Sequence, residues 1–280
     1  MNAERKRIPA HKFLLTVLLF LIGITMLAPL VWMISTSFKM ENEVFSFPIR
    51  WIPENSVGFD NYKEVWGAEY NFGMYYWNSI KITVISTALQ ILISALGAYG
   101  FTKIKWKWRD RVFLVYLATM MIPPQVMIVS RFAIMQKAGL YNTHLGIILM
   151  TMFSTYGVFL LRQAMMGIPD SLCESARIDG AGHVVIFSRI ILPLITPAIA
   201  TLAVLKFVWT WNDYQMPLIF LSRRTLFTIQ LGMKLFASES GSIYSLMMAA
   251  AVSATLPLIL VFLLGQRYII DGIASGAVKE

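Results

Sequence analysis

Residues 14–26 read LLTVLLFLIGITM, a run of thirteen residues without a single charge. The run lies inside a mostly apolar stretch over residues 13–38, which exceeds the roughly 20 residues that a helix needs to cross a bilayer. Four basic residues precede it within the first twelve positions, yet the apolar stretch over residues 13–38 is too long for the apolar part of a signal peptide and no small-x-small cleavage site follows. We therefore predict a retained membrane-spanning helix.

Long apolar stretches recur along the rest of the chain. Hydrophobic residues make up 57% and charged residues 14% of the 280 residues, and the mean hydropathy is +0.64, values that exclude a soluble globular enzyme, a disordered chain and a nucleic-acid-binding domain. The sequence predicts an all-α, polytopic membrane protein with six spans. The further spans are expected at residues 77–102, 112–135, 145–161, 195–221 and 245–266.

The distribution of lysine and arginine predicts the orientation of these spans. Fourteen of these residues fall in segments on one side and seven on the other, and basic loops stay in the cytoplasm. Both termini are therefore expected in the cytoplasm, in a multi-pass membrane protein. The expected parts are a cytoplasmic N-terminus (1–12), a single membrane domain (13–280), an external segment (39–76), a cytoplasmic loop (162–193) and a cytoplasmic tail (267–280).

The sequence offers no residues for catalysis, metal binding or nucleotide binding. Cys173 is the only cysteine and the three histidines lie far apart, so no zinc-ligand spacing exists. No glycine is followed by lysine, which excludes a P-loop. We expect a non-enzymatic chain without a cofactor of its own, whose use of ATP would depend on a partner.

The loop at 162–193 carries the most specific pattern. Ser171 and Glu174 have the spacing of a capping box, and Gly180 suits a left-handed helix stop, so a short helix is expected over 172–179. A second, largely apolar helix should follow and end at Pro193. In the first helix, one face is expected to carry Leu172, Cys173 and Ala176, and the other Asp170, Glu174 and Arg177.

This much apolar surface in a cytoplasmic loop favours a docked protein partner. The alternative is an amphipathic helix that lies on lipid, which the mixed-sign polar face disfavours.

An ordered series of motifs resembles the permease subunits of ABC importers. The loop matches the pattern E-A-A-x3-G-x9-I-x-L-P, with serine in place of the first alanine, and matches elsewhere point to the smaller, maltose-permease-like subunit of the carbohydrate branch. The loop residues are Glu174, Ser175, Ala176, Gly180, Ile190, Leu192 and Pro193. The other matches include Met121-Ile122-Pro123, Phe159-Leu160-Leu161-Arg162-Gln163, Ala176-Arg177-Ile178-Asp179-Gly180-Ala181, Trp211-Asn212-Asp213 and Gly276-Ala277-Val278-Lys279.

The resemblance implies the type I importer fold, a location in the bacterial inner membrane and a complete set of partners. These are a second homologous permease, two ATPase subunits that hold ATP and magnesium, an extracytoplasmic solute-binding protein, the carbohydrate substrate and membrane lipid, without nucleic acid. The loop would be a coupling helix pair that docks on an ATPase. The docking residues implied are Glu174, Ser175, Ala176, Asp179, Gly180, Ala181, Ile190, Leu192, Pro193, Gly276 and Lys279.

Two charges in the fifth span, Lys206 and Asp213, are costly in lipid and should face protein or water. They lie seven residues apart, so on one helix they would share a face about 10 Å apart. Nearby aromatic rings could stack on a sugar, although such rings are also common near membrane surfaces. The candidate residues for a substrate path are Lys206, Trp209, Trp211, Asn212, Asp213 and Tyr214.

Two other classes compete with the importer subunit. An ion-coupled secondary transporter would use Lys206 and Asp213 as coupling residues, but it would have no need of an apolar docking loop. An intramembrane enzyme would need paired carboxylates, or histidine with serine, at one depth, and no histidine lies within a predicted span.

Overall fold

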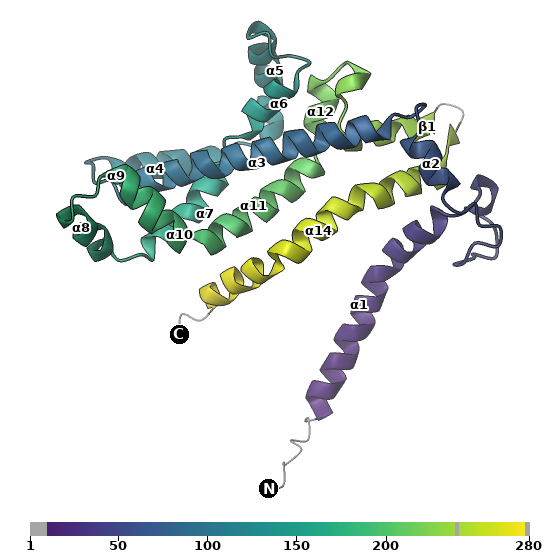
Figure 1. The fold of residues 1–280 in the computed structure, drawn as a ribbon, viewed down its shortest axis with the longest axis horizontal. Helices are drawn as coiled ribbons and strands as arrows, with labels where there is room; N and C mark the ends of the chain where they lie inside the picture. The colour runs from purple at the N-terminus through teal and green to yellow at the C-terminus, as the bar shows by residue number, and fades with distance from the viewer. Residues whose placement is uncertain (1–9, 239–240, 278–280) are drawn as a thin grey trace. The chain divides into compact units, whose positions relative to one another are not determined.

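The computed structural model describes residues 10–238 and 241–277 and consists mainly of helices (Figure 1). Three of them are long and apolar enough to cross a bilayer alone: α1, Ala10–Thr36, α3, Phe72–Thr102, and α14, Tyr244–Ala277. Three further candidate spans are pairs of shorter helices that meet at a bend. The described residues therefore hold up to six spans, in agreement with the predicted number.

The third predicted span, 112–135, is not one helix. Its two halves meet at an angle of 89° on either side of Pro123 and Pro124. Proline lacks the backbone N–H and disfavours helical backbone in the residue before it, so two in succession end the first half. The halves consist of α4, Arg109–Ala118, with the 3-10 turn η2, Thr119–Met121, and then η3, Pro124–Met127, with α5, Ile128–Lys137.

The fourth predicted span, 145–161, is also divided, into α6, His144–Thr151, and α7, Thr155–Met166, with a bend of 44°. Ser154 begins α7 as its N-cap, because its hydroxyl accepts a hydrogen bond of 3.0 Å from the backbone N–H of Gly157. A capped start inside an apolar stretch interrupts the helix without any proline.

The fifth predicted span, 195–221, ends ten residues early. Helix α11, Thr196–Trp211, stops before Asn212, whose side-chain amide donates to the backbone oxygen of Val208 at 2.9 Å. Short polar side chains that bind nearby backbone compete with the helix, which explains the stop. A separate helix, α12, Gln215–Phe220, follows.

The remaining elements are short. Two two-residue strands pair antiparallel, with Ala237 opposite Ser242, and they are the only strands among the residues that the structure describes. The other elements are η1, Glu41–Glu43, α2, Asp60–Trp66, α8, Asp170–Ile178, α9, His183–Val185, the π-helical η4, Ile186–Ile191, α10, Leu192–Leu194, η5, Arg224–Leu226, α13, Ile229–Gly232, η6, Met233–Phe236, β1, Ala237–Ser238, and β2, Gly241–Ser242.

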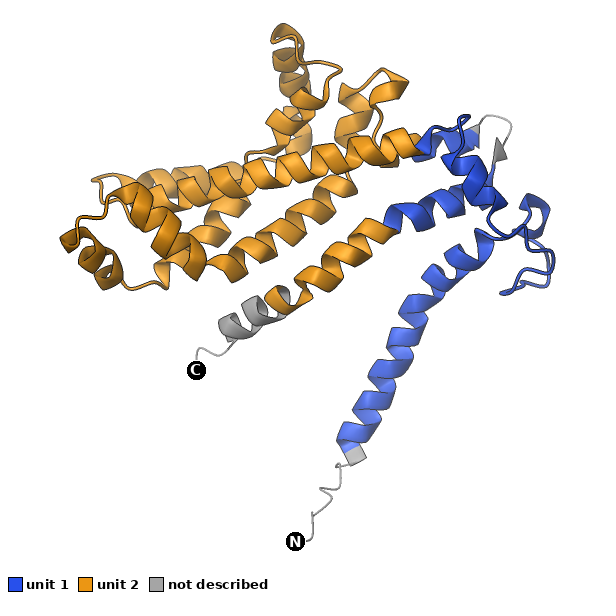
Figure 2. Ribbon diagram, viewed as in Figure 1, with its two compact units in different colours: residues 1–72, 233–255 blue, residues 73–232, 256–280 orange. Residues whose placement is uncertain are grey.

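The chain forms two compact units, residues 1–72 with 233–255 and residues 73–232 with 256–280 (Figure 2). In the first unit, the carboxylate of Glu41 accepts hydrogen bonds from the backbone N–H groups of Tyr244 and Ser245, at 2.9 and 2.7 Å. A carboxylate at this position stabilises the start of α14, where the helix dipole is positive.

The second unit contains the candidate docking loop and its support. A buried apolar cluster joins α3, α4, α7, α8, η4 and α11. Its members include Ala98 and Tyr99 of α3, Leu161 of α7, Cys173 of α8 and Ile186 of η4. Burial of these side chains fixes the docking loop to the ends of the spanning helices.

Candidate functional site

The first docking helix, α8, begins differently from the prediction. It starts at Asp170, directly after Pro169, and no side chain caps its N-terminus, so the capping box of Ser171 and Glu174 does not form. Proline just before a helix has a suitable φ, and an acidic residue in the first turn is stabilised by the helix dipole. These two residues replace the expected serine cap.

The end of α8 confirms the left-handed stop predicted at Gly180, where φ is +82°. The backbone N–H of Gly180 donates to the oxygen of Arg177 at 3.0 Å, and that of Ala181 to the oxygen of Ala176 at 2.9 Å. These two bonds form a Schellman motif, which satisfies the last carbonyls of the helix.

The second docking helix is a continuous helical segment over residues 183–194, formed by α9, η4 and α10. Its middle part is π-helical, a feature that the sequence did not predict. Ile186, Phe187 and Ile191 are buried against the core, and the ring of Phe187 lies 5.2 Å from that of Tyr99. The hydroxyl of Tyr99 also lies 3.0 Å from Nδ1 of His183, so this helix is fixed to α3.

A lysine at the end of α3 holds the start of α8. The side chain of Lys103 is only 3% exposed, and its Nζ donates to the backbone oxygen of Ile168 at 2.6 Å and to Oδ1 of Asp170 at 2.7 Å. The hydrogen bond and the charge of Lys103 lower the pKa of Asp170 below its ordinary value. The carboxylate of Asp170 therefore remains ionised at neutral pH, and its bond to Lys103 fixes α8 to the end of α3.

Arg162, at the end of the fourth span, forms a second connection. Its side chain is 12% exposed, and it donates to the backbone oxygen of Phe101 at 3.2 Å and to Asp110 at 2.9 Å. Its guanidinium also lies 4.0 Å from the ring centre of Phe113. One side chain thus links α7 to both α3 and α4.

The outer surface of the two docking helices carries uncovered aliphatic side chains among exposed polar ones. Ile178 is 86% and Val184 79% exposed, and Leu172 and Val185 are exposed beside them. The sequence placed Leu172 on the same face as Cys173 and Ala176, but Cys173 is buried and Leu172 points outward. Exposed aliphatic side chains around one glycine turn form a surface suited to a protein partner.

The predicted docking residues divide into two groups. Glu174, Ser175, Asp179, Gly180 and Pro193 are exposed and available to a partner. The other loop residues are half-buried, and they pack against the core of the protein itself: Ala176, Ala181, Ile190 and Leu192. In the tail, Gly276 lies near the end of α14, and Lys279 lies outside the described residues.

The two charges proposed for a substrate path do not share a helix face, because α11 ends between them. Lys206 is buried, and its Nζ donates to the backbone oxygen of Thr151 at 2.8 Å, where α6 ends. Asp213 instead accepts a hydrogen bond of 3.1 Å from the backbone N–H of Met216 in the first turn of α12. Both charges therefore have structural partners at helix breaks.

The neighbouring candidates are not gathered around one cavity either. Trp211 is buried and stacks on Phe207, with ring centres 5.8 Å apart, whereas Trp209 is exposed. Asn212 and Tyr214 are exposed as well. In the described part of the chain, no three His, Cys, Asp or Glu side chains are placed to hold a metal ion.

Sequence reasoning missed Tyr99 and Lys103, which fix the docking helices, and Arg162, which links α7 to α3 and α4. Their partners lie 84, 67 and 52 residues away in sequence, so no local pattern connects them. The only signal is position, since Lys103 directly follows the second predicted span and Arg162 the fourth.

Asp213 offers a test of the difference between a structural and a coupling role. Asp213→Asn keeps an acceptor for the Met216 N–H and should retain most transport, whereas Asp213→Leu removes it, costs about 1 kcal/mol of local stability and should lose most transport. Uptake by cells, measured across pH, is expected to show the same pH dependence in wild type and Asn variant. Loss of uptake in the Asn variant would instead identify Asp213 as a coupling residue.

Known proteins resemble the chain along almost its whole length. Residues 90–275 match the family described as binding-protein-dependent transport system inner membrane component. The chain is 31% identical over 277 residues to the arabinooligosaccharides transport system permease protein of Halalkalibacterium halodurans, with 99% of each chain covered. It is 34% identical over 251 residues to the lactose transport system permease protein of Rhizobium radiobacter, with 90% of each chain covered.

A solved structure shows the same fold. The crystal structure of a bacterial ABC transporter involved in the import of the acidic polysaccharide alginate contains a chain that superposes with a TM-score of 0.82. The two chains are 23% identical, and the superposition covers 96% of this chain and 99% of the other.

Proposed function

Because the chain belongs to the family of binding-protein-dependent transport system inner membrane components, we propose that it is the permease subunit of an ATP-driven importer of di- and oligosaccharides. The family predicted from the motifs and the ABC importer fold are thereby confirmed, and the chain is a non-catalytic membrane subunit. The substrate class rests on relatives whose names specify arabinooligosaccharides and lactose.

The observation that best supports the proposal is the uncovered apolar face around Gly180. In the proposed assembly, Leu172, Ile178 and Val184 enter a cleft of an ATPase subunit, and Glu174 pairs with a cation of that subunit. ATP binding and hydrolysis occur on the partner. Movement of the ATPase is transmitted to the spanning helices through the bonds of Lys103 and Tyr99.

The proposed complex contains further partners. A second, homologous permease completes the pathway, two ATPase subunits dock from the cytoplasm, and an extracytoplasmic binding protein delivers the sugar. The chain lies in the inner membrane with both termini in the cytoplasm. The buried pairing of Lys206 with the Thr151 oxygen supports a structural role for this lysine rather than ion coupling.

The experiment that tests the proposal determines whether ATP or a proton gradient drives uptake. Uptake of labelled di- or oligosaccharide is measured in cells that express the intact system, under two conditions. In one, ATP is depleted while the proton gradient is kept constant. In the other, the gradient is dissipated while ATP is kept constant. We expect uptake to stop only with ATP depletion, and an ATPase subunit to co-purify with the chain. Uptake that follows the proton gradient, without a co-purified ATPase, would contradict the proposal.

The topology can be tested with two single cysteines in a Cys173→Ala background. Glu64→Cys lies in the external segment, and Ile104→Cys lies in the basic loop after α3; both positions are exposed. An impermeant thiol reagent added to intact cells should label position 64 at once and position 104 only after permeabilisation. The reverse pattern would overturn both the orientation and the cytoplasmic location of the docking helices.

A further inference from the structure

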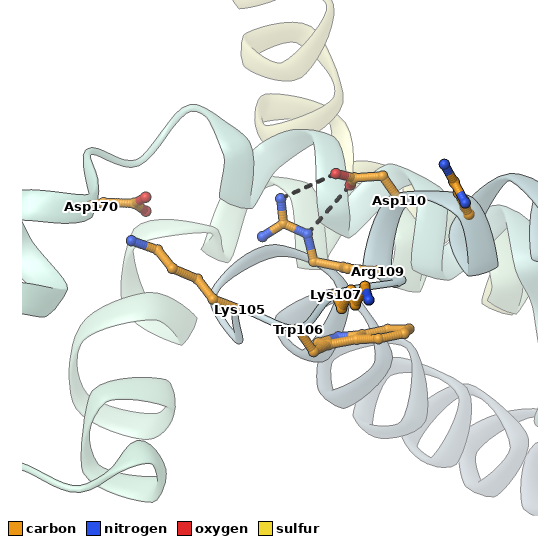
Figure 3. Close-up of a pocket in the computed structure, with 7 residues that line it drawn as sticks. Lys105, Trp106, Lys107, Arg109, Asp110 and Asp170 are labelled. Carbon is orange, nitrogen blue, oxygen red and sulfur yellow. Dashed lines mark hydrogen bonds and ion pairs between the residues drawn. The ribbon is translucent and has the colours of Figure 1, made fainter.

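A basic cavity lies next to the docking helices, in the loop between α3 and α4. It has a volume of about 440 Å³, within the range of about 300–1,000 Å³ that small-ligand sites occupy. Six of its seven lining residues are charged. The lining consists of Lys105, Trp106, Lys107, Arg109, Asp110, Arg111 and Asp170 (Figure 3).

Both carboxylates of this cavity are already neutralised by side chains outside its lining. Asp170 pairs with the buried Lys103 at 2.7 Å, and Asp110 pairs with Arg162 at 2.9 Å. Among the described residues, no ion pair includes Lys105, Lys107 or Arg111. The cavity therefore presents a surplus of positive charge, which favours an anionic ligand.

The loop that carries these cations is held in place by its own side chains. Nη1 of Arg109 donates to the backbone oxygen of Thr102 at 2.9 Å, and Nε1 of Trp106 to that of Gly100 at 3.3 Å. The guanidinium of Arg111 lies 4.9 Å from the ring centre of Trp108. Helix α4, ten residues long, also begins here without a side-chain cap, which adds a positive dipole end.

The position of the loop indicates where the anion comes from. The loop connects two candidate membrane spans, so we expect it close to a membrane surface. Ile104, Trp106 and Trp108 are exposed between the basic residues. Tryptophan is enriched at this depth, and basic clusters directly beside a spanning helix attract anionic lipids.

We propose that this cavity binds the phosphate group of an anionic glycerophospholipid. Lys105, Lys107 and Arg111 contact the phosphate oxygens, while Trp106 and Trp108 lie at the level of the glycerol backbone. In Figure 3, Lys105 points toward Asp170, so its ammonium stands at the side of the cavity nearest α8. A bound lipid would thus lie next to the first turn of a docking helix. The site rests on the geometry of this loop and not on the proposed sugar specificity.

The test measures lipid binding to the purified full-length chain, with its co-purifying subunits retained, by native mass spectrometry. Phosphatidylglycerol and phosphatidylcholine are titrated separately. We expect the wild type to prefer phosphatidylglycerol and the variant Lys105→Gln, Lys107→Gln, Arg111→Gln to lose at least about tenfold of that preference. The charge-conserving variant Lys105→Arg, Lys107→Arg, Arg111→Lys should keep it, which separates loss of the site from misfolding.

A matched control removes three exposed cations elsewhere, by Lys63→Gln, Arg223→Gln and Arg224→Gln, and should leave the preference unchanged. The proposal would be overturned if the control and the triple glutamine variant of the loop lost the preference for phosphatidylglycerol equally. It would also be overturned if the wild type bound both lipids equally. Displacement of the lipid by equimolar glycerol 3-phosphate would assign the cavity to a soluble phosphate ester instead. If the triple glutamine variant of the loop keeps the lipid preference but no longer co-purifies with an ATPase, the cavity belongs to a protein-docking surface. That result would also overturn the proposal.

Discussion

Replacement of Gly180 by leucine is expected to abolish uptake while the chain remains inserted in the membrane. Gly180 has φ +82° in the turn between the docking helices, and a side chain in this backbone conformation costs about 1–2 kcal/mol. No other atom lies within 4 Å of a Cβ built there, so the leucine itself would project into the space that a partner occupies. Both effects act on docking, and neither touches a spanning helix.

Two further variants separate the effects. Gly180→Asn tolerates the left-handed conformation better than leucine and should retain part of the uptake. Gly182→Leu adds the same bulk two residues later at an ordinary φ of −75°, so any loss there measures steric blocking alone. The measurements are uptake, membrane insertion and co-purification of the ATPase. Normal uptake with a normally bound ATPase in Gly180→Leu would contradict the docking role.

The second large effect is expected at Gly265, where α14 packs on α11. A Cβ at this position would lie too close to the Val204 side chain, so a side chain fits only if Val204 changes its rotamer or the helices move apart. Small residues allow close helix approach in membranes, and overpacking costs about 1–3 kcal/mol even for small insertions. Gly265→Leu should therefore strongly reduce the yield of monodisperse protein and its thermal unfolding temperature in detergent.

The control is Gly100→Leu in α3, because no atom outside its own helix lies within 4 Å of that position. It should change the unfolding temperature little. A compensating pair sharpens the test: Gly265→Ala should destabilise the protein, and Val204→Ala in the same chain should restore part of the loss. Equal unfolding temperatures for Gly265→Leu and Gly100→Leu would show that α11 and α14 do not pack closely.

The long helices could be predicted because composition alone identifies twenty or more apolar residues in sequence. The breaks at 152–154 and after Trp211 could not, since they depend on Ser154 and Asn212, polar side chains that bind backbone within otherwise apolar stretches. Pro123 and Pro124 predicted a kink, but the sequence did not indicate that the two halves meet at 89°.

The docking loop shows the same division between local and distant causes. The two helices and the stop at Gly180 follow from local pattern, whereas the capping box failed because Asp170, bound by Lys103, starts the helix earlier. That lysine lies 67 residues away, and nothing in one sequence connects the two. Cys173, and not its neighbour Leu172, is buried in the core, so Leu172 faces outward.

The attachment of the docking helices to α3 has a mechanical consequence. A single contact would let the docking helices rotate about it. Tyr99 and Lys103 instead contact the pair at two points, one turn apart on the same side of α3. In the proposed assembly, torque applied to the docking helices would therefore displace the end of α3. Since α3 continues without a break for 31 residues, about 46 Å at 1.5 Å per residue, it is long enough to carry such a displacement across the full thickness of a bilayer.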